Sequence, residues 1–227
     1  MRSHSRQACR FGVQASTIPV MAIDAPREPG DGLALRLAQE EHADDLLSRD
    51  PFALLTGMLL DQQFPMERAF AGPRLLADRL GVDRLDPSAI AEHDPVGFAA
   101  LMAGPPAVHR YPGSMAGRIQ ALARHVVDEY AGDTTTVWAS APTGAELLGR
   151  LQGMPGFGEQ KARIFVALLG KQCDVRPEGW REAAGAYGED GARRSVADVV
   201  DPSTLAEVRA FKQQQKAAAK GSSAAKG

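Results

Sequence analysis

Residues 151–162 have the sequence LQGMPGFGEQKA, and they join two apolar runs that have helical spacing. Between these runs, Pro155-Gly156-Phe157-Gly158 has room only for a tight turn. Neither glycine has a Cβ, so the backbone can approach another surface closely. The second helix should begin near Gly158, and the free N–H groups of its first turn would form an anion site suited to phosphate. The sequence therefore predicts a helical hairpin with a phosphate-binding turn.

Apolar residues elsewhere also recur at helical spacing, and the helix starts are clearly marked. Asp is a favoured N-cap and Pro is favoured at the first helical position. Four Asp-Pro pairs occur, at Asp50-Pro51, Asp86-Pro87, Asp94-Pro95 and Asp201-Pro202. Breaks are expected at Gly72-Pro73, Gly104-Pro105-Pro106 and Pro112-Gly113. No segment alternates as a half-buried strand does, so the sequence predicts an all-α fold with short loops.

Composition limits the classes of function. The chain has 227 residues, enough for one domain or two small lobes, and its 44% hydrophobic and 24% charged residues are typical of soluble globular proteins. A formal net charge of -2 means that nucleic-acid binding requires a local basic face. Cys9 and Cys173 are the two cysteines, which excludes a four-Cys iron–sulfur cluster and favours a reducing compartment. No apolar run approaches about 18 residues and the histidines lack metal-ligand spacing, so we expect a cytoplasmic protein without a metal site.

Three stretches, in order, resemble the endonuclease III class of helix-hairpin-helix DNA glycosylases. The turn is similar to that family's Leu-Pro-Gly-Val-Gly. Residues 51–63 (PFALLTGMLLDQQ) look like its first core helix, which ends in Gln, and residues 111–116 (YPGSMA) resemble the start of the helix before its hairpin. The resemblance covers about residues 50–181. It implies base excision repair, in which a damaged or mismatched base is extruded from double-stranded DNA and its N-glycosidic bond is hydrolysed.

The resemblance assigns DNA binding to the turn and its neighbours. Backbone N–H groups of about Gly156 and Gly158 would bind a phosphate, and the family often carries a monovalent cation on the carbonyls of this turn. Gln63 would fill the gap left by the extruded nucleotide. The alternatives are a turn that only packs and a Gln63 that only solvates a helix end. The complete set assigned to DNA is Gln63, Pro155, Gly156, Phe157, Gly158, Gln160 and Lys161.

Catalysis depends on two further positions. Bifunctional members carry a nucleophilic Lys just after the turn. Gln160 aligns with it, while Lys161 lies about 100° further around the helix, so the resemblance implies a monofunctional glycosylase without lyase activity. The family also has an Asp after the second hairpin helix, in Val-Asp-x-His, which assists the attack of water. That motif is absent here. Gap-free alignment places Glu178 at this position, whereas a shift of one residue would place Pro177 there and leave Glu178 as a surface residue.

We expect two lobes with a DNA cleft between them, with Gln63 on one wall, the turn on another and Glu178 at the junction. The expected segments are a disordered leader (1–32), a helical bundle lobe (50–171) with the hairpin at about 143–171, a second helical lobe (33–49 with 172–212, including a helix around Leu33–Leu47) and a flexible tail (213–227).

Some residues and functions keep two interpretations. Trp180 and Tyr187 either stack on an extruded base or, as we prefer, pack in the protein. Arg181, Arg193 and Arg194 either meet phosphates or form surface ion pairs. For the whole chain, a monomeric glycosylase is the first hypothesis. A DNA-binding or damage-sensing protein without catalysis is the second, and it is favoured if Glu178 points to solvent. A protein-interaction module is the third, and it is favoured if the hairpin face lacks a basic rim.

Overall fold

Residues 34–224 are described by the structure, a computed structural model, with side chains described to residue 218. The leader expected at 1–32 lies outside this range. Within it the fold is all-α, and the only β-type contact is an isolated bridge between Thr143 and Glu178. The helices are α1 (Glu41–Arg49), α2 (Pro51–Leu60), α3 (Met66–Leu80), α4 (Pro87–Glu92), α5 (Pro95–Ala103), α6 (Pro112–Tyr130), α7 (Thr136–Ala139), α8 (Gly144–Gln152), α9 (Glu159–Gln172), α10 (Trp180–Ala184) and α11 (Pro202–Ala224), with 3-10 turns η1 (Gly185–Tyr187) and η2 (Val196–Asp198).

Each of the four Asp-Pro pairs begins a helix, as predicted. The Asp side chain accepts hydrogen bonds from N–H groups of the first turn in α2, α4, α5 and α11. Asp50 does more than cap α2. Its second carboxylate oxygen accepts the N–H of Leu85 at 2.7 Å, which fixes the loop before α4 to the start of α2.

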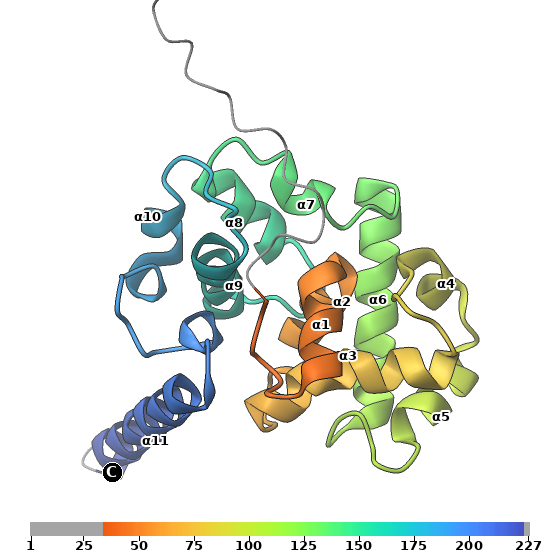
Figure 1. The fold of residues 1–227 in the computed structure, drawn as a ribbon, viewed down its shortest axis with the longest axis horizontal. Coiled ribbons are helices and arrows are strands. Elements are labelled where there is room, and N and C mark those ends of the chain that lie inside the picture. Colours follow the sequence, from red (N-terminus) through yellow and green to blue (C-terminus); the bar gives the residue numbers. More distant parts are fainter. Residues whose placement is uncertain (1–33, 225–227) are drawn as a thin grey trace, which may run out of the picture.

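The helices form two groups that differ from the expected lobes. The extensive contacts lie either among α1 to α6 or among α7 to α11 with η1 and η2 (Figure 1). Helix α1, expected with the C-terminal lobe, packs on α2 and α3, because its apolar face of Ala43, Leu46 and Leu47 is buried there. The hairpin α8–α9, expected with the first bundle, packs mainly with α10 and η2.

Two local expectations were wrong. The segment before α1 is not helical: Leu35 and Leu37 are buried in an irregular stretch, where Asp44 accepts the N–H of Ala38 at 2.7 Å. Helix α3 continues through Gly72-Pro73 instead of breaking. A Cβ on Gly72 would lie 2.7 Å from Leu60 Cδ1, so packing against α2 keeps this stretch helical despite the hydrogen bond that Pro73 cannot donate.

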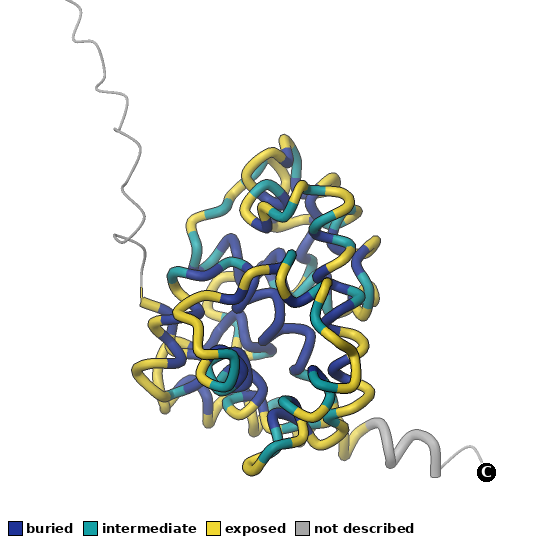
Figure 2. The backbone as a smooth tube through the Cα atoms, turned by 90° about the vertical axis from the view of Figure 1, so that its right-hand side faces the viewer, coloured by how far each residue is buried: buried dark blue, intermediate teal, exposed yellow. Residues whose placement is uncertain are grey.

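Helix α2 lies at the centre of the first group and is apolar on all sides. Nine of its ten residues are buried. Figure 2 shows that the buried segments of the chain gather in the interior of the molecule. A helix without a polar face is stable only when it is surrounded by protein. The buried α2 therefore holds the beginning of residues 61–65, which follow it directly, in a fixed position.

Helix α11 includes most of the segment that was assigned to the tail. Residues 213–224, expected to belong to a flexible tail, continue the helix. Its first turns are anchored by Leu205 and Val208, which are buried, and by contacts with η2. The remainder lies at one edge of the molecule (Figure 1).

Candidate functional site

The turn between α8 and α9 is as tight as the sequence predicted. The N–H of Phe157 donates to the carbonyl of Met154 at 3.1 Å, which closes the turn. Gly156 has a φ of +83°, and a Cβ at this position would overlap Leu59 Cδ1 of α2. Glycine is therefore required both for its backbone angle and for the close approach to α2.

Phe157 is a core residue. It is 3% exposed, and its ring meets that of Phe165 edge-on, with centroids 5.9 Å apart. Its N–H is already bonded within the turn. Phe157 was assigned to DNA from the resemblance, but neither its side chain nor its N–H is free for a ligand. Its burial instead anchors the turn.

The glycines on either side of Phe157 present free backbone donors. Gly156 and Gly158 are exposed, and within residues 34–224 neither N–H has an acceptor. Gly158 is the N-cap of α9 and has no side chain to bond the first-turn N–H groups. Glu159 is an acid in this first turn, but Arg163 binds it at 3.0 Å. The geometry suits an anion at the start of α9.

Lys161 links α9 to α2. Its Nζ donates to the carbonyls of Met58 at 2.6 Å and Leu59 at 2.9 Å, in the last turn of α2. Burial lowers the pKa of Lys161 to about 8, and the nearby Asp61 carboxylate partly opposes this. The ammonium is thus committed to the helix end, where the α2 dipole also favours a positive charge.

The two glutamines after α2 differ in their surroundings. Gln62 donates to the Leu59 carbonyl at 2.6 Å and accepts from Arg118 at 2.7 Å, so it is held in place. Gln63 is exposed, makes no side-chain hydrogen bond within the described residues, and has a φ of +53°. A non-glycine residue in this region is uncommon and is often found at functional sites. Of the two glutamines, Gln63 is the one whose side chain is free to insert into a bound ligand.

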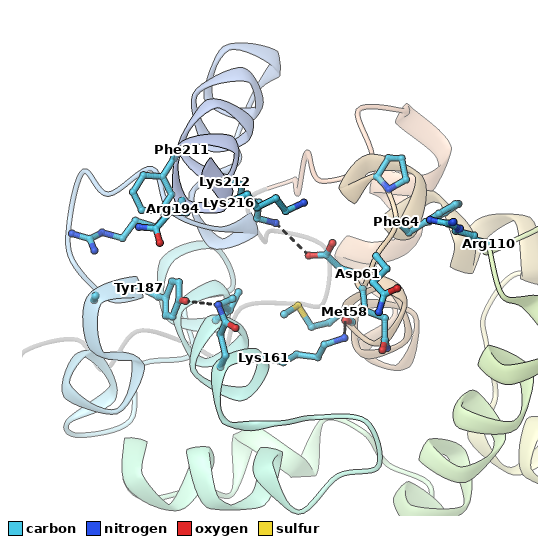
Figure 3. A pocket seen from close by; sticks show the side chains of 17 residues that line it. Met58, Asp61, Phe64, Arg110, Lys161, Tyr187, Arg194, Phe211, Lys212 and Lys216 are labelled. Carbon is cyan, nitrogen blue, oxygen red and sulfur yellow. Dashed lines mark hydrogen bonds and ion pairs between the residues drawn. The ribbon is translucent and has the colours of Figure 1, made fainter. Parts of the chain in front are cut away.

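A cleft of about 1090 Å³ lies between the two groups of helices (Figure 3). Residues after α2 line one side, the start of α9 lines the base, and η1 with α11 lines the other side. A second hollow of about 420 Å³ adjoins it, and Gln63 lines both hollows. Five cations line the larger cleft, namely Arg110, Lys161, Arg194, Lys212 and Lys216.

Asp61 is the carboxylate among the residues that line this cleft. Its side chain is 14% exposed, and its Oδ2 lies 3.8 Å from Lys212 Nζ. Across the cleft, Gln160 donates to the hydroxyl of Tyr187 at 2.9 Å. Gln160, which aligns with the family's catalytic Lys, therefore lies in the cleft, where it presents an amide.

Glu178 lies at the opposite end of the hairpin. It is exposed, does not line the cleft, and its backbone carbonyl accepts the N–H of Gly144 at 2.7 Å, at the start of α8. Helices α8 and α9 have 9 and 14 residues, so this end of the hairpin is roughly 13 to 20 Å from the turn. The structure brings Gln63, Gln160 and Lys161 together but leaves Glu178 apart from them.

Several cleft residues were missed or assigned differently from the sequence. Tyr187 packs against the core, as preferred, and also lines the cleft. Trp180 is buried against Gly170, as preferred. Arg194 both pairs with Glu189 at 3.1 Å and lines the cleft. In the sequence, Asp61 appeared only as one of the polar residues at the end of the helix expected at residues 51–63. Phe211 and Lys212 had been placed in the second helical lobe and Lys216 in the flexible tail, without a role in the cleft.

Comparison with protein-family models, curated proteins and solved structures found no match for this chain. Among residues 34–224, no cluster of three or more His, Cys, Asp or Glu side chains has the arrangement of a metal site. In the same range, no helix combines the length and apolarity that crossing a bilayer requires.

Proposed function

We propose that this protein binds double-stranded DNA that contains a damaged or mismatched base, extrudes the affected nucleotide into the cleft and hydrolyses its N-glycosidic bond. It would act as a monomer in the cytoplasm, as a monofunctional DNA glycosylase of base excision repair. The observation that carries this proposal is the basic cleft at the hairpin, in a chain whose net charge is -2.

The charge and the backbone donors suit one ligand. A cleft lined by five cations and a single carboxylate attracts a polyanion. The free N–H groups at Gly156 and Gly158 can bind one phosphate of the backbone, while Gln63 stands at the boundary of two hollows. Such a boundary residue can replace an extruded nucleotide in the base stack. A module that binds only proteins does not require this basic rim.

The reaction needs a carboxylate near the sugar, and we assign this role to Asp61 instead of Glu178. Asp61 would stabilise positive charge on the sugar as the bond to the base breaks, and would take a proton from the water that attacks C1′. The base leaves with the electron pair of the broken bond. Gln160 cannot form a Schiff base, and Lys161 is engaged by two carbonyls, so strand cleavage by an amine is not expected.

A second candidate is a DNA-binding or damage-sensing protein without catalysis. The position of Glu178 favours it, because the residue that aligns with the family's catalytic Asp is exposed at the end of the hairpin opposite the turn. The proximity of Asp61 to Lys212 also favours it, because an ion pair is a sufficient structural role for a carboxylate.

DNA binding is tested with Gly158→Asp. Gly158 has open space around its Cβ position and a φ of -75°, so Asp fits, and it would cap α9 while placing a negative charge in the anion site. We expect duplex affinity to fall roughly 10- to 100-fold, the value of one or two hydrogen bonds to a charged group. Gly149→Asp adds the same charge at an open position on α8 and should bind as wild type. Equal affinity of the two variants would exclude the turn as the phosphate site.

Catalysis is tested by release of free base from a panel of duplexes with different lesions, followed by alkali to reveal abasic sites. Asp61→Asn should lower the rate of release about 10²- to 10⁴-fold, the usual range for an acid–base group, while Glu178→Gln should keep the wild-type rate. The reverse result would restore Glu178. Absence of base release by wild-type protein that binds these duplexes tightly would favour the second candidate.

A further inference from the structure

Charge is distributed very unevenly along the chain. Residues 209–227 contain five cations and no Asp or Glu. Without them, 21 cations stand against 28 acidic residues, so residues 1–208 have a formal net charge of -7. The net charge of -2 is therefore the sum of an acidic part, residues 1–208, and a basic C-terminal segment, residues 209–227. An acidic body repels DNA, so a DNA-binding role requires cations concentrated at the contact.

Residues 209–224 of this basic segment belong to helix α11, and one face of the helix lines the cleft. Phe211, Lys212, Gln215 and Lys216 are the cleft-lining residues of α11, and their spacing places them on one side of the helix. Figure 3 shows Lys212 and Lys216 across the cleft from Lys161 and Asp61. The two lysines are about 6 Å apart along the helix axis, close enough to meet neighbouring phosphates of one strand.

The contacts of α11 across the cleft are few and polar. Arg209 pairs with Glu67 of α3, and Lys212 lies 3.8 Å from Asp61. The Lys212 side chain is 38% exposed, so a phosphate can reach its ammonium without unfolding the helix. Lys216 makes no ion pair within the described residues, although it lines the cleft. Lys216 therefore has no ion pair that requires its charge, and the one ion pair of Lys212 is long and leaves its ammonium accessible.

We propose that α11 is the second DNA-backbone contact of this protein. Lys212 and Lys216 bind phosphates of the duplex on the side of the cleft opposite the α8–α9 turn. The inference rests on the proposed DNA-binding function and adds its partner surface. The strand would then be held at two places, by backbone N–H groups at the turn and by ammonium groups on α11, with the cleft between them.

The test measures the salt dependence of affinity for an undamaged duplex in the full-length protein. Fluorescence anisotropy gives the binding constant between 50 and 200 mM salt for Lys212→Gln, Lys216→Gln and the double variant. Each lost phosphate contact should reduce the slope of log K against log salt by about 0.9, so the double variant should lose nearly two units. Gln has nearly the helix propensity of Lys, so α11 should keep its helicity, which circular dichroism can verify.

Arg84→Gln is the matched control. Arg84 is exposed, lies outside both hollows and makes no ion pair within the described residues. Its removal changes the net charge by the same amount as either single lysine variant and should leave the slope unchanged. A double variant with the wild-type slope would overturn the role of α11. If Gly158→Asp still weakened binding, the proposed function would stand without this contact. Failure of the wild-type protein to bind any duplex would remove both proposals.

Discussion

At the scale of a single residue, Lys161 shows how burial changes the pKa of an ammonium group at a helix end. The folded-state pKa of about 8 lies below the ordinary value of 10.5, so between these pH values the unfolded chain binds more protons than the folded one. The free-energy cost of burying the ammonium therefore applies in full below pH 8. This cost disappears as the pH rises toward 10.5, because the amine loses its proton. Relative to Lys161→Met, the free energy of unfolding of the wild type should rise by roughly 1–2 kcal/mol from pH 7.5 to 9.5, at 1.36 kcal/mol per pKa unit.

Urea denaturation of both proteins at the two pH values measures this difference. Lys171→Met is a useful comparison, because it also removes one ammonium from α9. Lys171 differs from Lys161 in that it pairs with the buried Asp198 of η2, at 2.6 Å. A stability difference between wild type and Lys161→Met that is constant across this pH range would show that Lys161 keeps its charge throughout it.

At the scale of an element, the α8–α9 turn depends on Gly156 both for its backbone angle and for its contact with α2. Gly156→Ala must adopt a φ near +83° and displace Leu59, so we expect a loss of about 1–3 kcal/mol in the free energy of unfolding. Gly149→Ala, in the exposed middle of α8 with open space at its Cβ position, should instead stabilise the protein by about 0.5–1 kcal/mol.

Thermal or urea unfolding of the two alanine variants compares these effects within one hairpin. Opposite signs are expected because the same side chain is added once to a left-handed turn and once to an ordinary helical position. If Gly156→Ala were as stable as Gly149→Ala, the turn would not require its close approach to α2.

At the scale of the whole molecule, the cleft brings together residues that are distant in sequence. Bound duplex should slow amide hydrogen exchange at three separate segments: residues 61–65, 153–161 and 209–216. The loop at 173–179 should exchange at its unbound rate, because it lies at the opposite end of the hairpin. Exchange measured by mass spectrometry with and without duplex tests this pattern. Protection of the 173–179 loop would place Glu178 at the DNA after all.

The local features of this fold could be predicted because they depend on neighbouring residues. Asp50 caps α2 and Gly156 adopts a left-handed angle for reasons contained in two or three consecutive residues. The helical spacing around residues 151–162 likewise fixed a hairpin without knowledge of its partners. Gln63 and Gln160 were identified differently, by alignment of two short stretches with the resembling glycosylase family.

Long-range packing decided the rest. Helix α3 continues through Pro73 because α2 covers Gly72, and α1 packs on α2 and α3 because its apolar face fits there. Glu178 has the chemistry of a catalytic acid, but its carbonyl is bonded to Gly144 at the far end of α8. Asp61 and Lys212 are about 150 residues apart in the chain and meet only through the fold. Sequence specifies helix starts and turns through short-range sterics and hydrogen bonds, whereas the composition of a cleft depends on which apolar faces bury each other.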